Sequence, residues 1–261
     1  MTADQPTEAV TRIPASVLGV FAHPDDETYL TATLMLRTLR AGGTATLVTA
    51  TRGEVGAPHP ELSSEEIAVI RERELREAMA RLGVDDVNFL DRIDGECAES
   101  DPPIARLVDL LASRRPELIV TFGPDGISRH SDHVAVSRWT SAAWLRAREQ
   151  GLLSGNSRLL YATVSETFAA RHFADYPDFP LTLQGEPAIT ADADIVLDIE
   201  PTAEEFAIKK AVLSAHETQT RGPVELLGED RYYDWWRSET FREPTAAELD
   251  AARGVRSHLG V

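Results

Sequence analysis

The sequence of 261 residues contains one cysteine, Cys97, and this scarcity excludes a framework of internal disulfides. Cys97 lies in the acidic stretch 94–99, where neighbouring carboxylates raise rather than lower the pKa of a thiol. It is therefore a poor candidate for a catalytic nucleophile. A chain of this length buries enough surface to be stable without disulfides. Because a lone thiol suits a reducing compartment, we predict a cytoplasmic protein.

No apolar run approaches the roughly 18 residues of a membrane-spanning helix, and residues 1–13 lack the pattern of a signal peptide. We expect residues 1–13 to form a flexible N-terminus and no membrane to be a partner. Basic residues are also few, because 26 Lys and Arg oppose 43 Asp and Glu, for a formal charge of −17. This charge disfavours nucleic acid as a partner and favours a neutral or cationic small-molecule substrate.

The segments that are present alternate between strand-like and helix-like patterns. Strands are predicted at residues 16–22, 44–50, 84–90, 117–122, 159–164 and 195–199, and helices at 28–41, 64–81, 103–114 and 206–216. Because parallel strands need long crossover connections, this alternation predicts an α/β fold with a Rossmann-like layered sheet, mostly parallel, with helices on both faces. Residues 1–261 are expected to form a single domain. Residues 168–190, rich in proline and aromatics, are expected to form a loop or lid.

One imidazole and several carboxylates directly follow the first predicted strand, at His23, Asp25 and Asp26. In open α/β sheets, ligands bind at the carboxyl ends of strands. A second polar cluster with His130 and His133 follows the strand predicted at 117–122. Zinc accepts imidazole nitrogen and carboxylate oxygen, and three protein ligands with an open position for water are typical of catalytic zinc. We therefore predict His23, Asp26 and His133 as ligands of a catalytic zinc ion.

Each cluster also has a simpler interpretation. Asp25 or Glu27 could cap the helix that follows them, since carboxylates stabilise a helix N-terminus. His130 and His133 could be incidental histidines on a surface loop. The chemistry of two imidazoles and one carboxylate also leaves iron or another first-row divalent metal open in place of zinc.

Two motifs carry a resemblance to a known family. The segment Ala22-His23-Pro24-Asp25-Asp26-Glu27, together with His130-x-Asp132-His133, strongly resembles the PIG-L/LmbE-like family of zinc-dependent de-N-acetylases. Similar segments continue between residues 16 and 220, among them Thr51-Arg52-Gly53-Glu54, Arg71-x-x-Glu74-Leu75 and His216-x-Thr218-Gln219. The resemblance implies a metal-dependent hydrolase that removes an N-acetyl group from an amino sugar or glycoconjugate.

The resemblance also implies roles for the residues around the metal. Asp25 would be the general base that activates a water molecule held by zinc. His130 would be protonated and would stabilise the oxyanion, and Asp132 would orient His130 and raise its basicity. Family members usually have proline where this chain has Ser131, which makes the loop around His130 less rigid.

Other matched residues have two interpretations each. Arg71 and Asp94 match positions that contact sugar hydroxyls in the family, but Arg71 also suits an ordinary i,i+3 surface pair with Glu74. His216 and Gln219 suit either the wall of a pocket or a hydrogen-bonded core. These alternatives depend on burial, which the sequence does not give.

Two further functions stay open at the level of sequence. One is an amidase that cleaves a larger thiol conjugate, and the other is a non-catalytic carbohydrate-binding protein. A binder needs neither Asp25 nor the pair His130 and Asp132, so their presence favours an enzyme. The aromatic patch at residues 231–236 suits stacking on a sugar ring or, preferably, packing in the core. The sequence leaves the natural substrate and homo-oligomer formation open.

Overall fold

The structure, a computed structural model, describes residues 12–56, 61–173 and 188–256 of the chain. Its centre is a seven-stranded sheet with the strand order β3-β2-β1-β4-β5-β9-β8. Strands β1 to β5 pair in parallel, whereas β9 runs antiparallel to both β5 and β8. The strands are β1 (Ser16–Phe21), β2 (Thr44–Thr49), β3 (Asp86–Phe89), β4 (Leu118–Phe122), β5 (Arg158–Ala162), β8 (Ile195–Ile199) and β9 (Glu239–Arg242). The predicted mostly parallel α/β sheet is confirmed.

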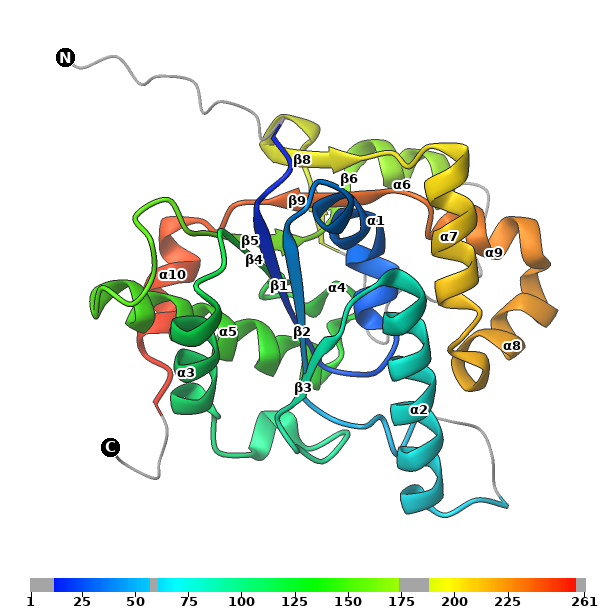
Figure 1. Ribbon diagram of the computed structural model, residues 1–261, viewed down its shortest axis with the longest axis horizontal. Coiled ribbons are helices and arrows are strands. Elements are labelled where there is room, and N and C mark those ends of the chain that lie inside the picture. The colour runs from blue at the N-terminus through cyan, green and yellow to red at the C-terminus, as the bar shows by residue number, and fades with distance from the viewer. Residues whose placement is uncertain (1–11, 57–60, 174–187, 257–261) are drawn as a thin grey trace.

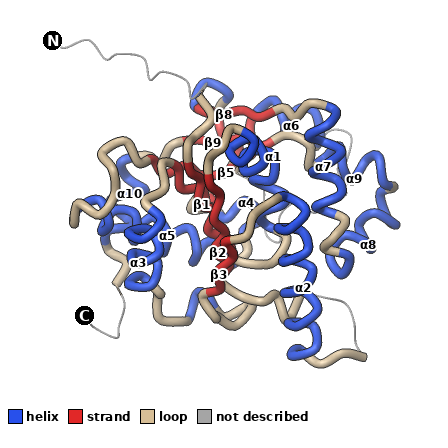
Figure 2. The backbone as a smooth tube through the Cα atoms, viewed as in Figure 1, coloured by secondary structure: helices blue, strands red, loops and turns tan. Residues whose placement is uncertain are grey.

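Helices cover both faces of this sheet (Figure 1). One side carries α3 (Ile104–Arg114), α5 (Ser131–Glu149) and α10 (Ala246–Arg253), and the other carries α1 (Asp26–Arg40), α2 (Ser64–Leu82) and α7 (Ala203–Leu213). Figure 2 shows the strands running between these two groups. Beyond α7 lie α8 (Glu217–Leu227) and α9 (Glu229–Trp235). The short elements are α4 (Gly126–Arg129), α6 (Glu166–His172), β6 (Val164–Ser165), β7 (Ile189–Thr190) and the 3-10 turns Cys97–Glu99 and Asp192–Asp194.

The strand order reverses at β1. The chain passes from β1 to β2 and β3 on one side and later places β4 and β5 on the other. Such a reversal is a topological switch point, where open α/β sheets bind their ligands. All five residues of β4 are buried, as are the last five of β1, which is expected for parallel strands covered on both faces. The segments that follow β1 and β4 therefore meet at the carboxyl edge of the sheet.

The helix α2 shows how local sequence sets an element's ends. Ser63 and Glu66 form a reciprocal capping box at its start: the Ser63 hydroxyl accepts from the Glu66 N–H, and the Glu66 carboxylate accepts from the Ser63 N–H. The helix ends at Gly83, whose φ of 90° lies in the left-handed region that favours glycine. These ends agree with the helix predicted at 64–81.

Several helices are missing from the sequence prediction, among them α5, α6, α8, α9 and α10. No helix is predicted over 131–149, where the structure has α5. Most residues of α5 are buried, around most of its circumference, so its sequence lacks the one-sided apolar pattern that identifies a surface helix. The predicted loop at 168–190 is wrong at its start, because the Ser165 side chain caps α6 and the helix continues to His172. Residues 174–187 of that loop lie outside the described part of the chain.

The aromatic patch at 231–236 lies mainly in α9 and packs inward. Tyr232 and Trp235 are each 1% exposed, so the preferred core role of the patch agrees with the structure. The Trp236 ring lies against Tyr29 of α1, with 4.4 Å between ring centroids. In the described ranges, no helix combines the length and apolar character needed to cross a membrane.

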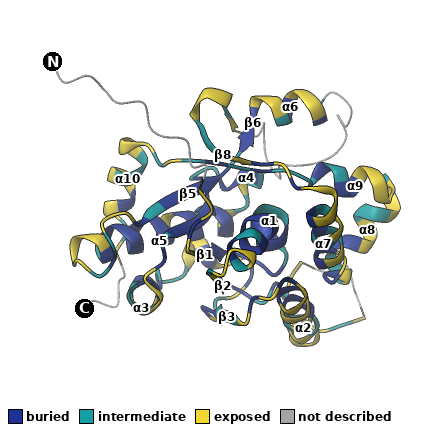
Figure 3. Cartoon of the chain, turned by 45° about the horizontal axis from the view of Figure 1, so that its top comes forward, coloured by how far each residue is buried: buried dark blue, intermediate teal, exposed yellow. Residues whose placement is uncertain are grey.

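A buried ion pair fixes α1 against its neighbours. Figure 3 shows α1 enclosed between the sheet and α7. Lys209 of α7 donates to a Glu239 carboxylate oxygen of β9 at 2.8 Å and to the Tyr29 carbonyl of α1 at 2.9 Å. Glu239 also accepts from the backbone N–H groups of Thr33 and Leu34 in the middle of α1. Three elements therefore share one pair of buried charges.

We predict that Lys209→Met destabilises the protein by about 3–5 kcal/mol, because it leaves the Glu239 carboxylate buried without its cation. Urea unfolding measures this free energy. Lys210→Met is the matched control, since Lys210 is partly exposed and its ion pair with Glu229 spans 3.8 Å. A loss below about 1 kcal/mol for Lys209→Met would show that the pair contributes no more than a surface pair.

Candidate active site

The carboxyl ends of β1 and β4 bring two imidazoles and a carboxylate into contact. His23 and Asp26 follow β1, and His133 lies in the first turn of α5, which follows β4 and α4. His23 Nδ1 lies 3.2 Å from His133 Nε2 and 3.5 Å from Asp26 Oδ2. His133 Nε2 lies 3.4 Å from Asp26 Oδ1. Ligands of tetrahedral zinc with bonds of about 2.1 Å lie about 3.4 Å apart. The two nitrogens lie near that distance from each other, and each lies near it from one of the two Asp26 oxygens.

Each imidazole is held by a contact on its other nitrogen. His23 Nε2 lies 3.0 Å from Asp94 Oδ1 and 3.3 Å from Asp132 Oδ2. His133 Nδ1 lies 3.0 Å from the carbonyl oxygen of Gly126. An acceptor keeps the proton on the nitrogen that it faces, so the lone pair of the opposite nitrogen stays available to a metal. Both rings therefore direct their ligand nitrogen toward Asp26.

Other donors surround the same rings. Ligand atoms of His23, His130 and His133 lie within 4.8 Å of one another, and so do those of His23, Asp94 and Asp132. Asp94 and Asp132 contact the side of the His23 ring opposite His133. Their position suits orientation of His23, whereas Asp26 lies beside both ligand nitrogens.

Burial and charge set the protonation of the predicted ligands. Burial lowers the pKa of His133 to about 4, against the attraction of Asp26. Burial would raise the pKa of Asp26, but His133 and His23 lower it well below its usual range. Burial would likewise lower the pKa of His23, but its hydrogen bonds to Asp132, Asp26 and Asp94 raise it well above the usual value. A neutral His133 and an ionised Asp26 are the forms that bind a metal, whereas His23 must release the proton on Nδ1 when a metal binds.

Asp25 occupies a strained position between β1 and α1. Its φ of 130° and ψ of −34° lie outside the regions that residues with a side chain ordinarily adopt, at a cost of roughly 1–3 kcal/mol. Its side chain forms no capping hydrogen bond to α1, so the simpler interpretation of Asp25 as a helix cap is not supported. Burial raises the pKa of Asp25 to about 7, and the charge of Arg71 opposes this rise.

His130 lies beside the predicted ligands as the N-cap of α5. Its ring centroid is 4.7 Å from that of His23 and 5.2 Å from that of His133. Burial and the charge of His23 lower the pKa of His130. Its Nδ1 accepts a hydrogen bond from the Asp132 backbone N–H at 3.1 Å. An accepting Nδ1 belongs to a neutral imidazole with its proton on Nε2, which differs from the expected protonated ring. The role of His130 stays a prediction.

Asp132 has different partners from those expected. Its carboxylate accepts from the backbone N–H groups of Gly95 at 2.8 Å and Cys97 at 3.2 Å, and it faces His23. Within the described residues, no hydrogen bond joins this carboxylate to the His130 ring. Asp132 lies in the first turn of α5, where its side chain reaches the turn at 94–97 and its backbone N–H contacts the His130 ring. The expected orientation of His130 by this carboxylate stays a prediction.

The two residues predicted to contact substrate lie in the same cluster. Asp94 is 7% exposed, and its second carboxylate oxygen accepts from the Val55 N–H at 3.0 Å. Burial would raise the pKa of Asp94, but its hydrogen bond with His23 lowers it to about 2. Arg71 is 2% exposed and lies beside Asp25, with 3.5 Å between Nη2 and Oδ2. Contact of either residue with a sugar stays a prediction.

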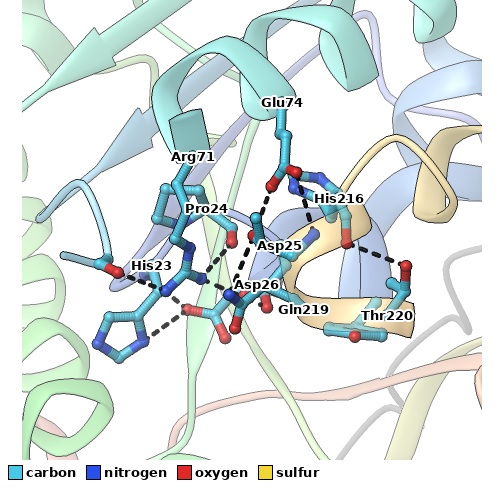
Figure 4. A network of polar contacts seen from close by, with 12 residues as sticks. His23, Pro24, Asp25, Asp26, Arg71, Glu74, His216, Gln219 and Thr220 are labelled. Atoms are coloured by element: carbon cyan, nitrogen blue, oxygen red, sulfur yellow. Dashed lines mark hydrogen bonds and ion pairs between the residues drawn. The ribbon is translucent and has the colours of Figure 1, made fainter. Parts of the chain in front are cut away.

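A polar network behind Asp25 was not predicted from the sequence (Figure 4). His216 Nε2 lies 3.1 Å from a Glu27 carboxylate oxygen, and the other Glu27 oxygen accepts from the Asp25 N–H at 3.1 Å. Glu74 accepts hydrogen bonds from the N–H and hydroxyl of Thr218, so it joins α2 to α8 instead of pairing with Arg71 on the surface. His216 is fully buried and has the core role. In the sequence, the match of His216-x-Thr218 to the family was the one signal that could have pointed to this network.

Comparison with known proteins identifies the family. Residues 18–144 match the PIG-L family, described as GlcNAc-PI de-N-acetylase. A 1D-myo-inositol 2-acetamido-2-deoxy-alpha-D-glucopyranoside deacetylase from Salinispora arenicola is 31% identical over 245 residues, covering 82% of this chain and 79% of the relative. The chain belongs to the PIG-L family. A Kineococcus radiotolerans protein of the same name is 35% identical over 169 residues, which span about half of each chain: 53% of this one and 47% of the relative.

The fold of this PIG-L family member also resembles solved structures. N,N'-diacetylchitobiose deacetylase from Pyrococcus horikoshii matches with a TM-score of 0.61 and 18% identity, covering 88% of this chain and 83% of that one. At this identity the likeness supports the fold alone. The reaction must be argued from the residues of the site.

We predict that His133→Ala lowers the affinity for zinc by more than about 100-fold, because it removes a predicted ligand. Asp94→Asn should lower it by about 10–100-fold, because it weakens the orientation of His23. Competition with a zinc chelator measures both affinities, and Asp25→Asn should bind zinc nearly as well as the wild type. Wild-type affinity in His133→Ala would show that His133 is not a ligand.

Proposed function

We propose that this protein is a metal-dependent hydrolase that removes the N-acetyl group from an amino sugar or glycoconjugate. Support comes from relatives named as deacetylases of a 2-acetamido-2-deoxy-glucopyranoside. The observation that carries the proposal is the convergence of two imidazoles and one carboxylate from two distant segments of the chain, with a second carboxylate, Asp25, next to Asp26 in sequence. A carbohydrate-binding protein would have no use for Asp25 in a strained position beside that triad.

The metal ligands are assigned to His23, Asp26 and His133, with zinc as the first choice and another first-row divalent ion as the alternative. When bound, the metal supplies Lewis acidity, which lowers the pKa of water and polarises the amide carbonyl. The protein contributes two fixed imidazoles and one carboxylate, so a divalent cation keeps a net positive charge in the site.

Asp25 is assigned as the general base. Its carboxylate belongs to neither the ligand triad nor the cap of α1, so it is free to take a proton from the attacking water. It then passes this proton to the departing nitrogen. The new C–O bond forms first and gives a tetrahedral intermediate, and the C–N bond breaks as the nitrogen takes the proton. One water is consumed for each acetate and free amine released.

His130 is assigned as a neutral hydrogen-bond donor to the carbonyl oxygen. The Asp132 N–H occupies Nδ1, which places the ring proton on Nε2. A donor aimed at the oxygen that gains negative charge stabilises the transition state more than the substrate. Asp132 therefore acts on His130 through its backbone and on His23 through its carboxylate.

We predict that Asp25→Asn lowers kcat by about 10²–10⁴-fold, because the amide cannot accept the proton from water. Acetate release is measured on N-acetylglucosamine, diacetylchitobiose and N-acetylglucosaminyl-inositol. Asp85→Asn is the matched control, since Asp85 is exposed on the loop before β3. Wild-type turnover by Asp25→Asn would refute the base assignment.

The same panel tests the substrate class. The proposal requires the wild type to release acetate from at least one N-acetylated sugar. Release of amine only from a larger thiol conjugate would favour the amidase alternative. Tight binding of a sugar without hydrolysis, in zinc-loaded protein, would favour the carbohydrate-binding alternative.

A further inference from the structure

The backbone of Asp25 is held on both sides of its Cα atom. Its carbonyl oxygen accepts hydrogen bonds from the Thr28 and Tyr29 N–H groups, at 2.9 and 3.1 Å, in the first turn of α1. Its own N–H donates to Glu27 Oε2 at 3.1 Å. Because the direction of the Cα–Cβ bond follows from the backbone conformation, these contacts set where the Asp25 carboxylate points.

The contact with Glu27 restrains the strained angle of Asp25 directly. Hydrogen bonds to the carbonyl before a helix are made by any α-helix, so they do not require unusual backbone angles. The φ of 130° is different, because a strained conformation persists only where surrounding contacts over-determine it. The φ angle describes rotation about the bond between the backbone nitrogen and Cα. A fixed acceptor for the N–H therefore holds φ in place, and Glu27 is that acceptor.

Glu27 is held in turn by a histidine from a distant element. Glu27 is fully buried, and its second oxygen, Oε1, lies 3.1 Å from His216 Nε2. The Thr28 hydroxyl also donates to Oε1, at 2.7 Å. His216 is the N-cap of α8, and its Nδ1 has no hydrogen-bond partner among the described residues. In the described ranges, the hydrogen bonds of the ring therefore lie on its Nε2 side, toward Glu27.

The backbone of His216 is fixed where α7 turns into α8. Its N–H donates to the Leu213 carbonyl at 3.0 Å, and its carbonyl accepts from the Thr220 N–H and hydroxyl, both at 2.9 Å. The ring is thus anchored in a turn that does not depend on the segment after β1. A chain of contacts runs from this turn through Glu27 to the Asp25 N–H.

Neither substrate contact nor stability alone accounts for this pair. The side chains of His216 and Glu27 are 1% and 0% exposed, so they offer no surface to a substrate. Replacing a buried ion pair by apolar side chains of similar volume is often neutral or stabilising, so such a pair is weak evidence for a role in stability. Buried polar pairs can instead specify one conformation, and the conformation that this pair contacts is that of Asp25.

We propose that His216 is a positioning residue for Asp25: it holds the Glu27 carboxylate, which fixes the strained backbone from which Asp25 reaches the attacking water. This inference rests on the proposed function, because it concerns how the base of that reaction is aimed. It assigns His216 an effect on turnover and leaves zinc and substrate affinity to other residues.

The test measures kcat, KM, zinc content and thermal stability for variants of the full chain purified with zinc. His216→Ala should lower kcat by about 10²-fold with KM and zinc content nearly unchanged, since misplacing a catalytic group by about 1 Å costs that factor. His216→Gln should retain more of kcat, because its amide N–H can still donate to Glu27. Glu217→Ala is the matched control, as Glu217 is the next residue and is exposed. Wild-type kcat in His216→Ala, or a rise in KM at unchanged kcat, would overturn the inference.

Two further variants separate positioning from a general loss of stability. Leu111→Ala opens a cavity beside α3, on the other side of the sheet, and should lower thermal stability while kcat stays within about threefold of the wild type. Glu27→Gln keeps the shape of the side chain but has one accepting oxygen in place of two, so it should lower kcat by about tenfold. A loss of turnover in Leu111→Ala equal to that in His216→Ala would count against positioning. Wild-type kcat in Glu27→Gln would do so whether or not His216→Ala folds.

A double-mutant cycle tests whether His216 acts through Asp25. In the Asp25→Asn background, His216→Ala should lower the remaining kcat by less than about threefold, because residues that act as a unit are not additive. An equal loss in both backgrounds would contradict the inference. Neither result affects the acetate release by the wild type that supports the proposed function.

A crystal structure of His216→Ala gives a readout independent of activity. Asp25 is expected to leave its positive φ there, because Glu27 becomes free to turn away from the Asp25 N–H. An Asp25 backbone unchanged from the wild type would overturn the inference even if no substrate is hydrolysed.

Discussion

Two imidazole nitrogens and a carboxylate held within 3.5 Å of one another are the constraint on which the rest of the site depends. Buried polar groups at this spacing are stable together when a cation lies between them. Their meeting requires β1 and β4 to be neighbours, since His23 and Asp26 follow one strand and His133 follows the other. The reversal of strand order at β1 therefore determines where the site lies, because it brings the ends of β1 and β4 together.

Three cationic side chains are buried around α1, and each is paired with a buried or nearly buried carboxylate. They are Arg71 of α2, Lys209 of α7 and His216 at the start of α8. All three pairs touch the first half of α1 or the residues just before it. Loss of one partner from such a pair is costly, so Asp25, the proposed general base, lies in rigid surroundings. Rigidity at this place is what a fixed proton acceptor requires.

The sequence was sufficient for the parts of the fold in which local pattern and tertiary packing agree. The apolar runs of β1 and β4 and the capped helix α2 are of this kind, and the polar motifs after β1 and β4 located the candidate site. It was insufficient where burial removes the pattern, as in α5, or where partners come from distant elements. The carboxylate of Asp132 faces His23 and the turn at 94–97, and the pairing of His216 with Glu27 joins α8 to the first motif. Such contacts depend on how the elements pack, which spacing along the chain does not specify.

Position 23 uses both nitrogens of its ring, one beside Asp26 and His133 and the other beside Asp94 and Asp132. Cysteine or aspartate could replace the first contact, but neither side chain has an N–H donor on its far side. Either substitution would leave the buried carboxylates of Asp94 and Asp132 without the ring N–H that both now contact. Variation at position 23 is thus coupled to positions 94 and 132, and an evolutionary route away from histidine would have to alter all three in concert.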